Sequence, residues 1–240
     1  MKINVFTKKA RKLLPLKYCG AVIVAAGNAS RMGGIDKVMA PLGGEPMIVR
    51  TVRAFQQCDA IGEIVVVTRE DLLTRIMGLC KDFPKVQAVV TGGSDRCASV
   101  RAGLNALSGQ VRLVAVQDGA RPLVTWQVID RTVRAANTYG AAAPAIPVKD
   151  TIKVVKGGIV AATPDRSKLQ AVQTPQVFDI AILKAALAKA VKDNAPITDD
   201  CSAVDNMGMS VKMVEGDERN IKVTTPMDLK IAELLLEEEK

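Results

Sequence analysis

Short apolar runs alternate with longer amphipathic stretches along most of the chain. The runs are rich in Val, Ile and Ala, which is typical of strands buried on both faces of a sheet. They predict strands at residues 21–25, 63–68, 86–90, 112–117, 141–146 and 211–215. The stretches between them predict helices at residues 47–57, 71–80, 96–107, 125–139, 180–191 and 226–238. This order predicts an α/β fold, with a mostly parallel sheet and helices on both of its faces.

One stretch interrupts the alternation. Residues 151–155 and 159–163 read as two short strands joined by a Lys-Gly-Gly turn of the hairpin type. A hairpin this short cannot bury its own faces, so it should lean on the main sheet or on another subunit. We therefore expect a basic N-terminal extension at 1–17 and one domain at 18–240, with a β-arm at about 150–166.

The composition limits the chemistry that the chain can perform. Lys and Arg outnumber Asp and Glu by 33 to 25, which fits a solvated surface or basic side chains that converge on an anion such as a polyphosphate. The four Phe, two Tyr and one Trp leave few platforms for stacked bases, which argues against a nucleic acid partner. The chain contains no histidine, so the commonest general base is absent. Catalysis must then depend on positioning and charge.

The cysteines and the apolar runs indicate the compartment. The five cysteines are widely separated and form no C-x-x-C pair, which argues against a disulfide framework or a structural zinc site. No uninterrupted apolar run reaches the roughly 18 residues of a membrane span. The first residues lack the apolar stretch of a secretory signal and the serine richness of an organellar address. We therefore expect a cytoplasmic protein with no membrane contact.

The first predicted strand runs into a loop with the sequence AAGNASRMGG, residues 25–34, which is followed by Lys37. Small residues after a strand let backbone N–H groups approach a ligand closely, and Arg31 and Lys37 are placed to meet its phosphates. The loop matches neither G-x-G-x-x-G nor G-x-x-x-x-G-K-[ST]. Such loops also occur where nothing binds, so this one indicates a nucleoside triphosphate site only together with further motifs.

Further clusters follow other predicted strands, where α/β folds place their ligands. They are TGGSDRCASV at 91–100, QDGARP at 117–122, TPQVF at 174–178, ITDD at 197–200 and NIKVTTP at 220–226. Purely structural interpretations stay open for several of their residues. These are Asp118 as a helix cap, Arg121 as a surface charge, Thr198 as the cap of a helix beginning at Asp199, and Lys222 as an edge-strand lysine.

In order and spacing, these segments and PVKDTIK at 147–153 resemble the 2-C-methyl-D-erythritol 4-phosphate cytidylyltransferase family of the non-mevalonate isoprenoid pathway. The resemblance covers about residues 18–238. It implies a Rossmann-like nucleotidyltransferase domain with a protruding β-hairpin arm, and a homodimer in which each arm helps to close the partner's site. It also implies a Mg²⁺-dependent cytidylyltransferase of isoprene biosynthesis. Such an enzyme converts CTP and methylerythritol phosphate to 4-diphosphocytidyl-2-C-methyl-D-erythritol and pyrophosphate.

The resemblance further implies roles for individual residues, motif by motif. The catalytic cations would be Arg31, Lys37 and Lys222. The nucleotide would be bound by Ala25, Ala26, Gly27, Gly93, Ser94, Ser99, Asp118 and Gly119. The acceptor would be bound by Asp118, Arg121, Thr151, Arg166, Thr174, Thr198 and Lys222. Magnesium would be held mainly by the CTP phosphates, with Asp118 as a candidate protein ligand.

In such a reaction, an oxygen of the acceptor phosphate attacks the α-phosphorus of CTP in line. That oxygen is already an anion near neutral pH, so no general base is required, which agrees with the absence of histidine. Two alternatives stay open. A ribitol-5-phosphate cytidylyltransferase would share most of these loops, although the DGARP and ITDD segments favour methylerythritol phosphate. A non-catalytic nucleotide-binding regulatory module is disfavoured, because Arg31, Lys37 and Lys222 are all present.

The chain also departs from the family's usual pattern. Gln117 stands where many relatives carry histidine, and Asp36 stands where proline is common. The loop between Arg31 and Lys37 is one residue short, and the basic extension has no usual counterpart. These departures leave the triphosphate interpretation in place and make the loop geometry harder to predict.

Overall fold

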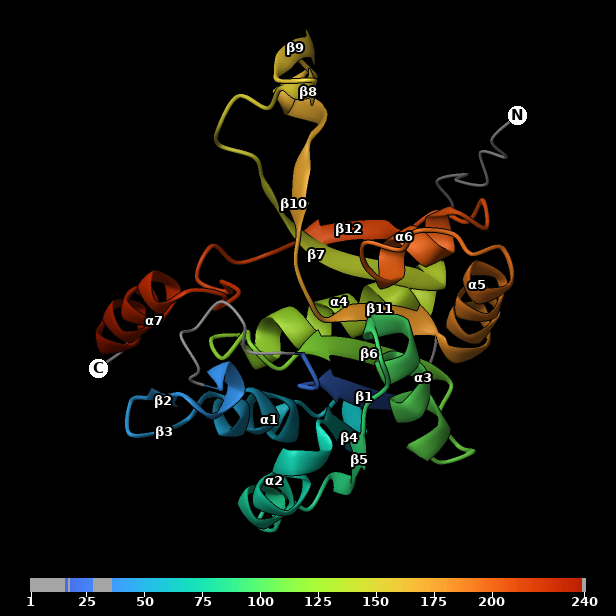
Figure 1. Cartoon of the computed structure of the whole chain (residues 1–240). Helices are drawn as coiled ribbons and strands as arrows, with labels where there is room; N and C mark the ends of the chain where they lie inside the picture. Colours follow the sequence, from blue (N-terminus) through green and yellow to red (C-terminus); the bar gives the residue numbers. More distant parts are fainter. Residues whose placement is uncertain (1–15, 17, 28–35, 239–240) are drawn as a thin grey trace.

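The computed structural model describes residues 16, 18–27 and 36–238, and its centre is an eight-stranded sheet (Figure 1). The strands are β1 (Cys19–Val24), β4 (Ile61–Thr68), β5 (Val86–Thr91), β6 (Leu113–Asp118), β7 (Ala141–Pro147), β10 (Gln170–Val172), β11 (Gln176–Asp179) and β12 (Lys212–Glu215). They lie in the order β10-β7-β11-β6-β1-β4-β5, with β12 also paired to β7.

The sheet is largely parallel, and its strand order reverses once beside β1. Strands β1, β4, β5 and β6 run parallel, whereas β10 and β11 run antiparallel to their neighbours. From β1 the chain moves outward to β4 and β5, and it then returns to place β6 on the other side of β1. The carboxyl ends of β1 and β6 therefore form a topological switch point, where open α/β sheets bind their ligands.

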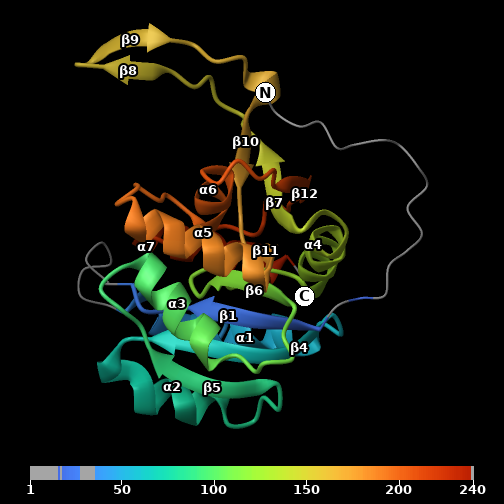
Figure 2. The same cartoon turned by 90° about the vertical axis from the view of Figure 1, so that its right-hand side faces the viewer.

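Helices cover both faces of the sheet, as the sequence predicts. Figure 2 shows α4 and α5 on opposite sides of it. Helices α1 (Met47–Gln57), α2 (Leu73–Cys80) and α4 (Trp126–Tyr139) pack on one face. Helices α3 (Arg96–Ala106), α5 (Ile180–Lys192) and α6 (Asp200–Asp205) pack on the other face. Helix α7 (Pro226–Glu237) lies beside the small hairpin of β2 (Pro41–Leu42) and β3 (Glu45–Pro46). Three short 3₁₀ helices span Lys37–Met39, Glu70–Leu72 and Arg166–Lys168.

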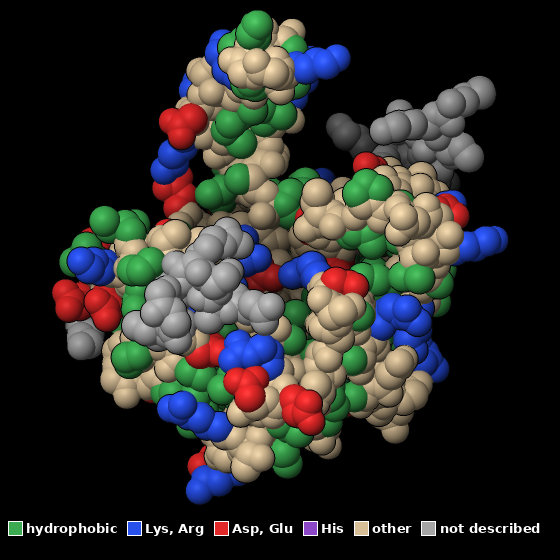
Figure 3. Space-filling model, in the orientation of Figure 1, with side chains coloured by type: hydrophobic (Ala, Val, Ile, Leu, Met, Phe, Trp, Pro, Cys, Tyr) green, Lys and Arg blue, Asp and Glu red, His purple; other side chains and the backbone are tan. Residues whose placement is uncertain are grey.

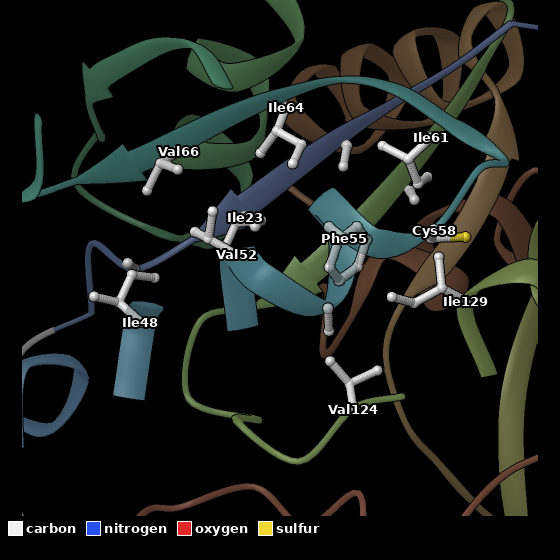
Figure 4. Packing of buried hydrophobic residues seen from close by; sticks show 14 of the residues in the cluster. Ile23, Ile48, Val52, Phe55, Cys58, Ile61, Ile64, Val66, Val124 and Ile129 are labelled. Carbon is white, nitrogen blue, oxygen red and sulfur yellow. The ribbon is translucent and has the colours of Figure 1, made fainter. Parts of the chain in front are cut away.

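The core forms because alternate strand residues point to opposite faces that are both covered. On β1, Ile23 belongs to the cluster under α1 and α4, while Val22 belongs to the cluster under α3 and α5. Phe55 of α1 is fully buried and lies near Cys58, Ile61 and Ile129 (Figure 4). Continuous apolar runs are thus required, since neither face of a central strand meets water.

The predicted α/β class is confirmed, and the six predicted strands and six predicted helices are all present. Their ends differ by a few residues, for instance because a 3₁₀ turn at Glu70–Leu72 precedes α2, which then begins at Leu73. The sequence did not predict β10, β11 or α6, which are at most six residues long. Elements this short show too little periodicity to be recognised.

The predicted hairpin is present as β8 (Val154–Lys156) and β9 (Ile159–Ala162), with Gly157 and Gly158 at positive φ in its turn. Its strands are shorter than predicted. Among the described residues they pair only with each other, and Figure 1 shows the arm standing clear of the body. The expectation that the arm leans on the chain's own sheet is therefore wrong. The alternative, packing against another subunit, stays a prediction.

Nearly all of the expected N-terminal extension lies outside the described residues, so the boundary between 1–17 and 18–240 stays a prediction. Among the residues that the structure describes, no helix is long and apolar enough to cross a membrane.

Candidate active site at the switch point of the sheet

A cavity of about 470 Å³ opens beyond the carboxyl ends of β1, β4, β5 and β6. This volume lies within the usual range for small-molecule sites. Figure 3 shows basic and acidic side chains side by side in a hollow near the centre of one face. The lining consists of residues 24–27, 37–38, 68–70, 91–96, 99, 118, 120 and 222. Because most of these segments follow parallel strands, the cavity lies where the switch point places a ligand.

The loop after β1 begins the site. The Gly119 N–H donates to the Val24 carbonyl at 2.8 Å, which ties this loop to the end of β6. The Lys37 ammonium lies 3.7 Å from the position that a Cβ on Gly27 would occupy, so the lysine faces the start of the loop. Ala25, Ala26 and Gly27 line the cavity, whereas Gly119 supports it from behind. Arg31 lies outside the described residues, and its role stays a prediction.

A second wall comes from the turn after β5 and the first turns of α3. A Cβ on Gly92 would lie only 2.5 Å from the Ala26 Cβ, and one on Gly93 would collide with Ala98. The Gly93 N–H donates to the Ser99 hydroxyl oxygen at 3.2 Å. Glycine is therefore needed for the two loops to meet. The predicted nucleotide residues Gly93, Ser94 and Ser99 all line the cavity.

Asp36, the residue before Lys37, is held in place by two contacts. One carboxylate oxygen accepts a hydrogen bond from the Val38 N–H at 3.2 Å, and the other lies 2.6 Å from the Arg69 guanidinium. Arg69 comes directly after β4 and lines the cavity. Asp36 thus anchors this loop to the residue that follows β4. Arg69 was not among the residues predicted for the site.

Asp118, the last residue of β6, is the centre of a charged cluster. Its Oδ1 lies 2.7 Å from the Arg96 guanidinium, while its Oδ2 lies 2.9 Å from the Lys222 ammonium and 3.5 Å from Arg121. Its backbone N–H donates to the Thr174 hydroxyl oxygen at 3.1 Å. Burial alone would raise the pKa of Asp118, but the charges of Arg96, Lys222 and Arg121 outweigh it and hold that pKa well below its usual range. With three cations around one carboxylate, this cluster of four side chains is net positive, which suits an anionic ligand.

Arg96 also contacts a second carboxylate. Its other terminal nitrogen lies 2.7 Å from an oxygen of Asp200. Asp200 is 1% exposed, and burial raises its pKa against the opposing charge of Arg96. Neither residue was among the predicted site residues, although both stand in the motifs quoted above. Arg96 is the arginine of the GG-x-x-R pattern, and Asp200 is the second aspartate of ITDD, so both motifs did contain these site residues. Sequence spacing alone could not pair them with Asp118.

The structure separates the predicted acceptor residues into three groups. Asp118 and Lys222 line the cavity. Arg121 and Thr174 lie behind Asp118, and Arg121 donates to the Asn220 carbonyl at 2.6 Å. The third group does not line the cavity of this chain. It consists of Thr151 and Arg166 at the root of the arm and Thr198 before α6.

Several of the purely structural interpretations are wrong. Thr125, not Asp118, caps the helix that follows β6, and only 12% of the Arg121 side chain is exposed. Lys222 belongs to no strand and faces the cavity. The helix in the ITDD segment begins at Asp200 with Asp199 as its cap, so Thr198 does not cap it.

The side chains of the site can be compared with those that would bind the expected magnesium ion. Among residues 16, 18–27 and 36–238, no group of three or more His, Cys, Asp or Glu side chains could hold a metal ion. Single carboxylates do line the cavity, including Asp118. Magnesium commonly binds through substrate phosphates with one or two carboxylates, so this lining fits an ion carried mainly by a bound triphosphate.

The family is decided by comparison with known proteins. The sequence profile described as IspD, 2-C-methyl-D-erythritol 4-phosphate cytidylyltransferase, matches residues 19–238. The chain belongs to this family. The predicted resemblance is thus confirmed over nearly the whole chain, including the segments that line the cavity.

Curated and solved relatives agree with this assignment. The 2-C-methyl-D-erythritol 4-phosphate cytidylyltransferase of Symbiobacterium thermophilum is 47% identical over 220 residues, covering 91% of this chain and 92% of its own. The same-named protein of Geobacillus kaustophilus is 45% identical, covering 90% and 96%. Among solved structures, 4-diphosphocytidyl-2C-methyl-D-erythritol synthase from Anaerococcus prevotii is 30% identical with a TM-score of 0.84, covering 92% and 96%.

Proposed function

We propose that this chain is an enzyme that transfers the cytidylyl group of CTP to 2-C-methyl-D-erythritol 4-phosphate, releasing pyrophosphate. Membership of the family and 47% identity to a curated relative of that name support the reaction. The observation in this chain that carries the proposal is the position of Lys222 and Asp118 in the cavity at the switch point. There, fixed cations face a space large enough for a nucleotide.

The cavity suggests how CTP would lie in it. The triphosphate would follow the backbone of residues 25–27 toward Lys37, with Arg31 as a further cation predicted from the sequence. The cytosine and ribose would lie against the turn that holds Gly93, Ser94 and Ser99. Small residues on both walls let backbone groups make these contacts, so base selection would depend on the loop backbone more than on side chains.

The chemistry follows from the charges. An oxygen of the acceptor phosphate attacks the α-phosphorus of CTP, a new P–O bond forms, and the bond to pyrophosphate breaks. Lys222 lies where it would lower the repulsion between these anions and stabilise the charge on the reacting phosphoryl oxygens. Asp118 is a poor proton acceptor, because its neighbours hold its pKa well below the usual range. It therefore serves to hold Lys222 in place rather than as a base.

Magnesium bound to the CTP phosphates would neutralise part of their charge and orient them. Asp118 was the candidate protein ligand, but both of its oxygens already face cations, so we propose that the CTP phosphates hold the ion. Arg121 and Thr174 keep Asp118 in position. The reaction needs no proton transfer by the protein, in agreement with a chain that contains no histidine.

We also propose that the arm forms a homodimer contact and that Thr151 and Arg166 near its root reach the acceptor in the partner's site. The exposed apolar side chains of the arm support this, since Val155 is 55% and Ile159 is 75% exposed. A two-stranded hairpin is marginal on its own, so it gains stability by packing against a second chain. Thr198 would act near the same acceptor site. A cytoplasmic location remains part of this proposal.

The test is pyrophosphate release by the purified protein with Mg²⁺. Each of CTP, ATP, GTP and UTP is supplied in turn with methylerythritol phosphate or ribitol phosphate. We expect release only with CTP and methylerythritol phosphate. Faster release with ribitol phosphate would instead identify the sister activity. Absence of release with every pair, while CTP still binds, would favour the non-catalytic module.

A further inference from the structure

Three motif residues have no part in the proposed chemistry, yet they meet in space. They are Arg96 of GG-x-x-R, Gln176 of TPQ and Asp200 of ITDD, and each is at least partly buried. None of them was among the residues predicted for the site. Their contacts form one continuous path that starts at the sheet and ends at Lys222.

The path begins where Gln176 fastens α6 to the sheet. Its amide N–H donates to an Asp199 carboxylate oxygen at 2.7 Å, and its amide oxygen accepts from the Cys201 N–H at 2.9 Å. Gln176 pairs with Val116 in the ladder between β11 and β6, the strand that ends at Asp118. The backbone on both sides of Asp200 is therefore held at a fixed place relative to Asp118.

Arg96 spans the gap between the two carboxylates. One terminal nitrogen lies 2.7 Å from Asp200 and the other lies 2.7 Å from Oδ1 of Asp118. The planar guanidinium can hold two carboxylates in one fixed geometry, whereas a lysine ammonium is a point charge on a flexible stem. With Oδ1 occupied by Arg96, the other oxygen of Asp118 is directed to the Lys222 ammonium at 2.9 Å.

We propose that Arg96 and Asp200 are positioning residues for the cytidylyl transfer, acting through the carboxylate of Asp118 to fix the ammonium of Lys222. This inference rests on the proposed function. Arg96 takes one Asp118 oxygen, so the carboxylate cannot turn and draw Lys222 away from the reacting phosphates. Asp200 in turn keeps Arg96 from swinging into the cavity, whose wall it forms.

The energetics favour a positioning role over a purely structural one. Two charges removed from water cost about as much as their attraction returns, so a buried ion pair adds little net stability compared with apolar packing. Asp200 is fully buried, and the pKa of its carboxyl is raised by that burial. Apolar side chains in these places would stabilise the fold about as well, but they would not fix the orientation of the Asp118 carboxylate.

The test is a double-mutant cycle between Arg96→Lys and Lys222→Met, assayed as pyrophosphate release from CTP and methylerythritol phosphate. Arg96→Lys keeps the charge but cannot reach both carboxylates. We expect it to lower kcat by about tenfold to a hundredfold, because small misplacements of a catalytic group cost up to about that much, while the KM for CTP changes less than about threefold. In the Lys222→Met background, the same change should have almost no further effect, because the group that it positions is gone.

A second cycle joins Arg96→Lys and Asp200→Asn, whose combined loss should stay close to that of Arg96→Lys alone. Arg101→Lys on α3 and Asp205→Asn on α6 are matched exposed controls and should leave kcat unchanged. Melting temperatures show which variants fold. Should Arg96→Lys not fold, Asp200→Asn in the Lys222→Met background provides the same test.

Several outcomes would overturn the inference. Losses that multiply in the first cycle would show that Arg96 does not act through Lys222. A rise in the KM for CTP with kcat unchanged would make Arg96 a nucleotide-binding residue. Unchanged kinetics in folded Arg96→Lys would leave only a structural role. Failure of the proposed function looks different, because the unaltered protein itself would then release no pyrophosphate.

Discussion

Replacement of Lys222 by methionine is the change that most directly tests the role of charge at the site. Methionine matches the length of the apolar stem of lysine closely and lacks the ammonium group. Asp118 would still be held by Arg96 at 2.7 Å and by Arg121 at 3.5 Å, so its carboxylate stays paired. We therefore expect a folded protein whose melting temperature changes little.

The size of the effect can be worked out from the geometry. A unit charge about 4 Å from the ammonium interacts with it by about 4 kcal/mol at an effective dielectric constant of about 20. The Lys222 side chain is 42% exposed, so solvent screening reduces that gain. If about 2–3 kcal/mol remain, the loss in kcat/KM is about 30- to 150-fold, since about 1.4 kcal/mol corresponds to tenfold.

The assay is steady-state pyrophosphate release from CTP and methylerythritol phosphate, with Lys189→Met as the matched control. Lys189 of α5 forms an exposed ion pair with Asp193, which caps the end of that helix, and it does not line the cavity. The control should keep full activity. A Lys222→Met protein that retains more than about a third of the original kcat/KM would refute the electrostatic role of this lysine.

Three further predictions concern the fold, the pH profile and the arm. Phe55→Ala should lower the free energy of unfolding by about 3–5 kcal/mol in urea titrations, and a loss below about 1 kcal/mol would contradict its place in the core. The kcat/KM should fall below about pH 6, as the dianionic acceptor phosphate takes up a proton and becomes a monoanion. Asp118 should add no inflection to the pH profile of kcat/KM above pH 5, because its depressed pKa keeps it charged until well below the ordinary value of about 4. An inflection between pH 5 and 8 that Asp118→Asn removes would disprove this. Replacing residues 152–162 with a short glycine linker should give a monomer in sedimentation and weaker binding of methylerythritol phosphate; an unchanged dimer with unchanged affinity would refute the shared arm.

The sequence predicted the fold where its signals are local. Helix α1 spans residues 47–57 as predicted, because its apolar positions recur at the helical period. Helix α7 begins at Pro226 with Thr225 as its cap, which is also a local signal. By contrast, β11 overlaps the TPQVF motif and is four residues long. Its antiparallel place between β6 and β7 depends on tertiary pairing that no short pattern reveals.

The site was predictable only in part, for a related reason. Residues on loops directly after strands, such as Ala25 and Ser94, line the cavity because the switch point is implied by the order of the elements. Arg96 was missed because its partners are distant in sequence, 22 residues away at Asp118 and 104 residues away at Asp200. Such ion pairs appear only when the folded sheet brings α3, β6 and α6 together.

The most direct test of the central claim follows the atoms of the reaction. The protein is incubated with Mg²⁺, CTP and methylerythritol phosphate whose phosphate oxygens carry ¹⁸O, and the products are analysed by mass spectrometry. If the acceptor phosphate attacks the α-phosphorus of CTP, all of the label should appear in 4-diphosphocytidyl-2-C-methyl-D-erythritol and none in pyrophosphate. Label in the released pyrophosphate, or the absence of a cytidine-containing product, would contradict the account.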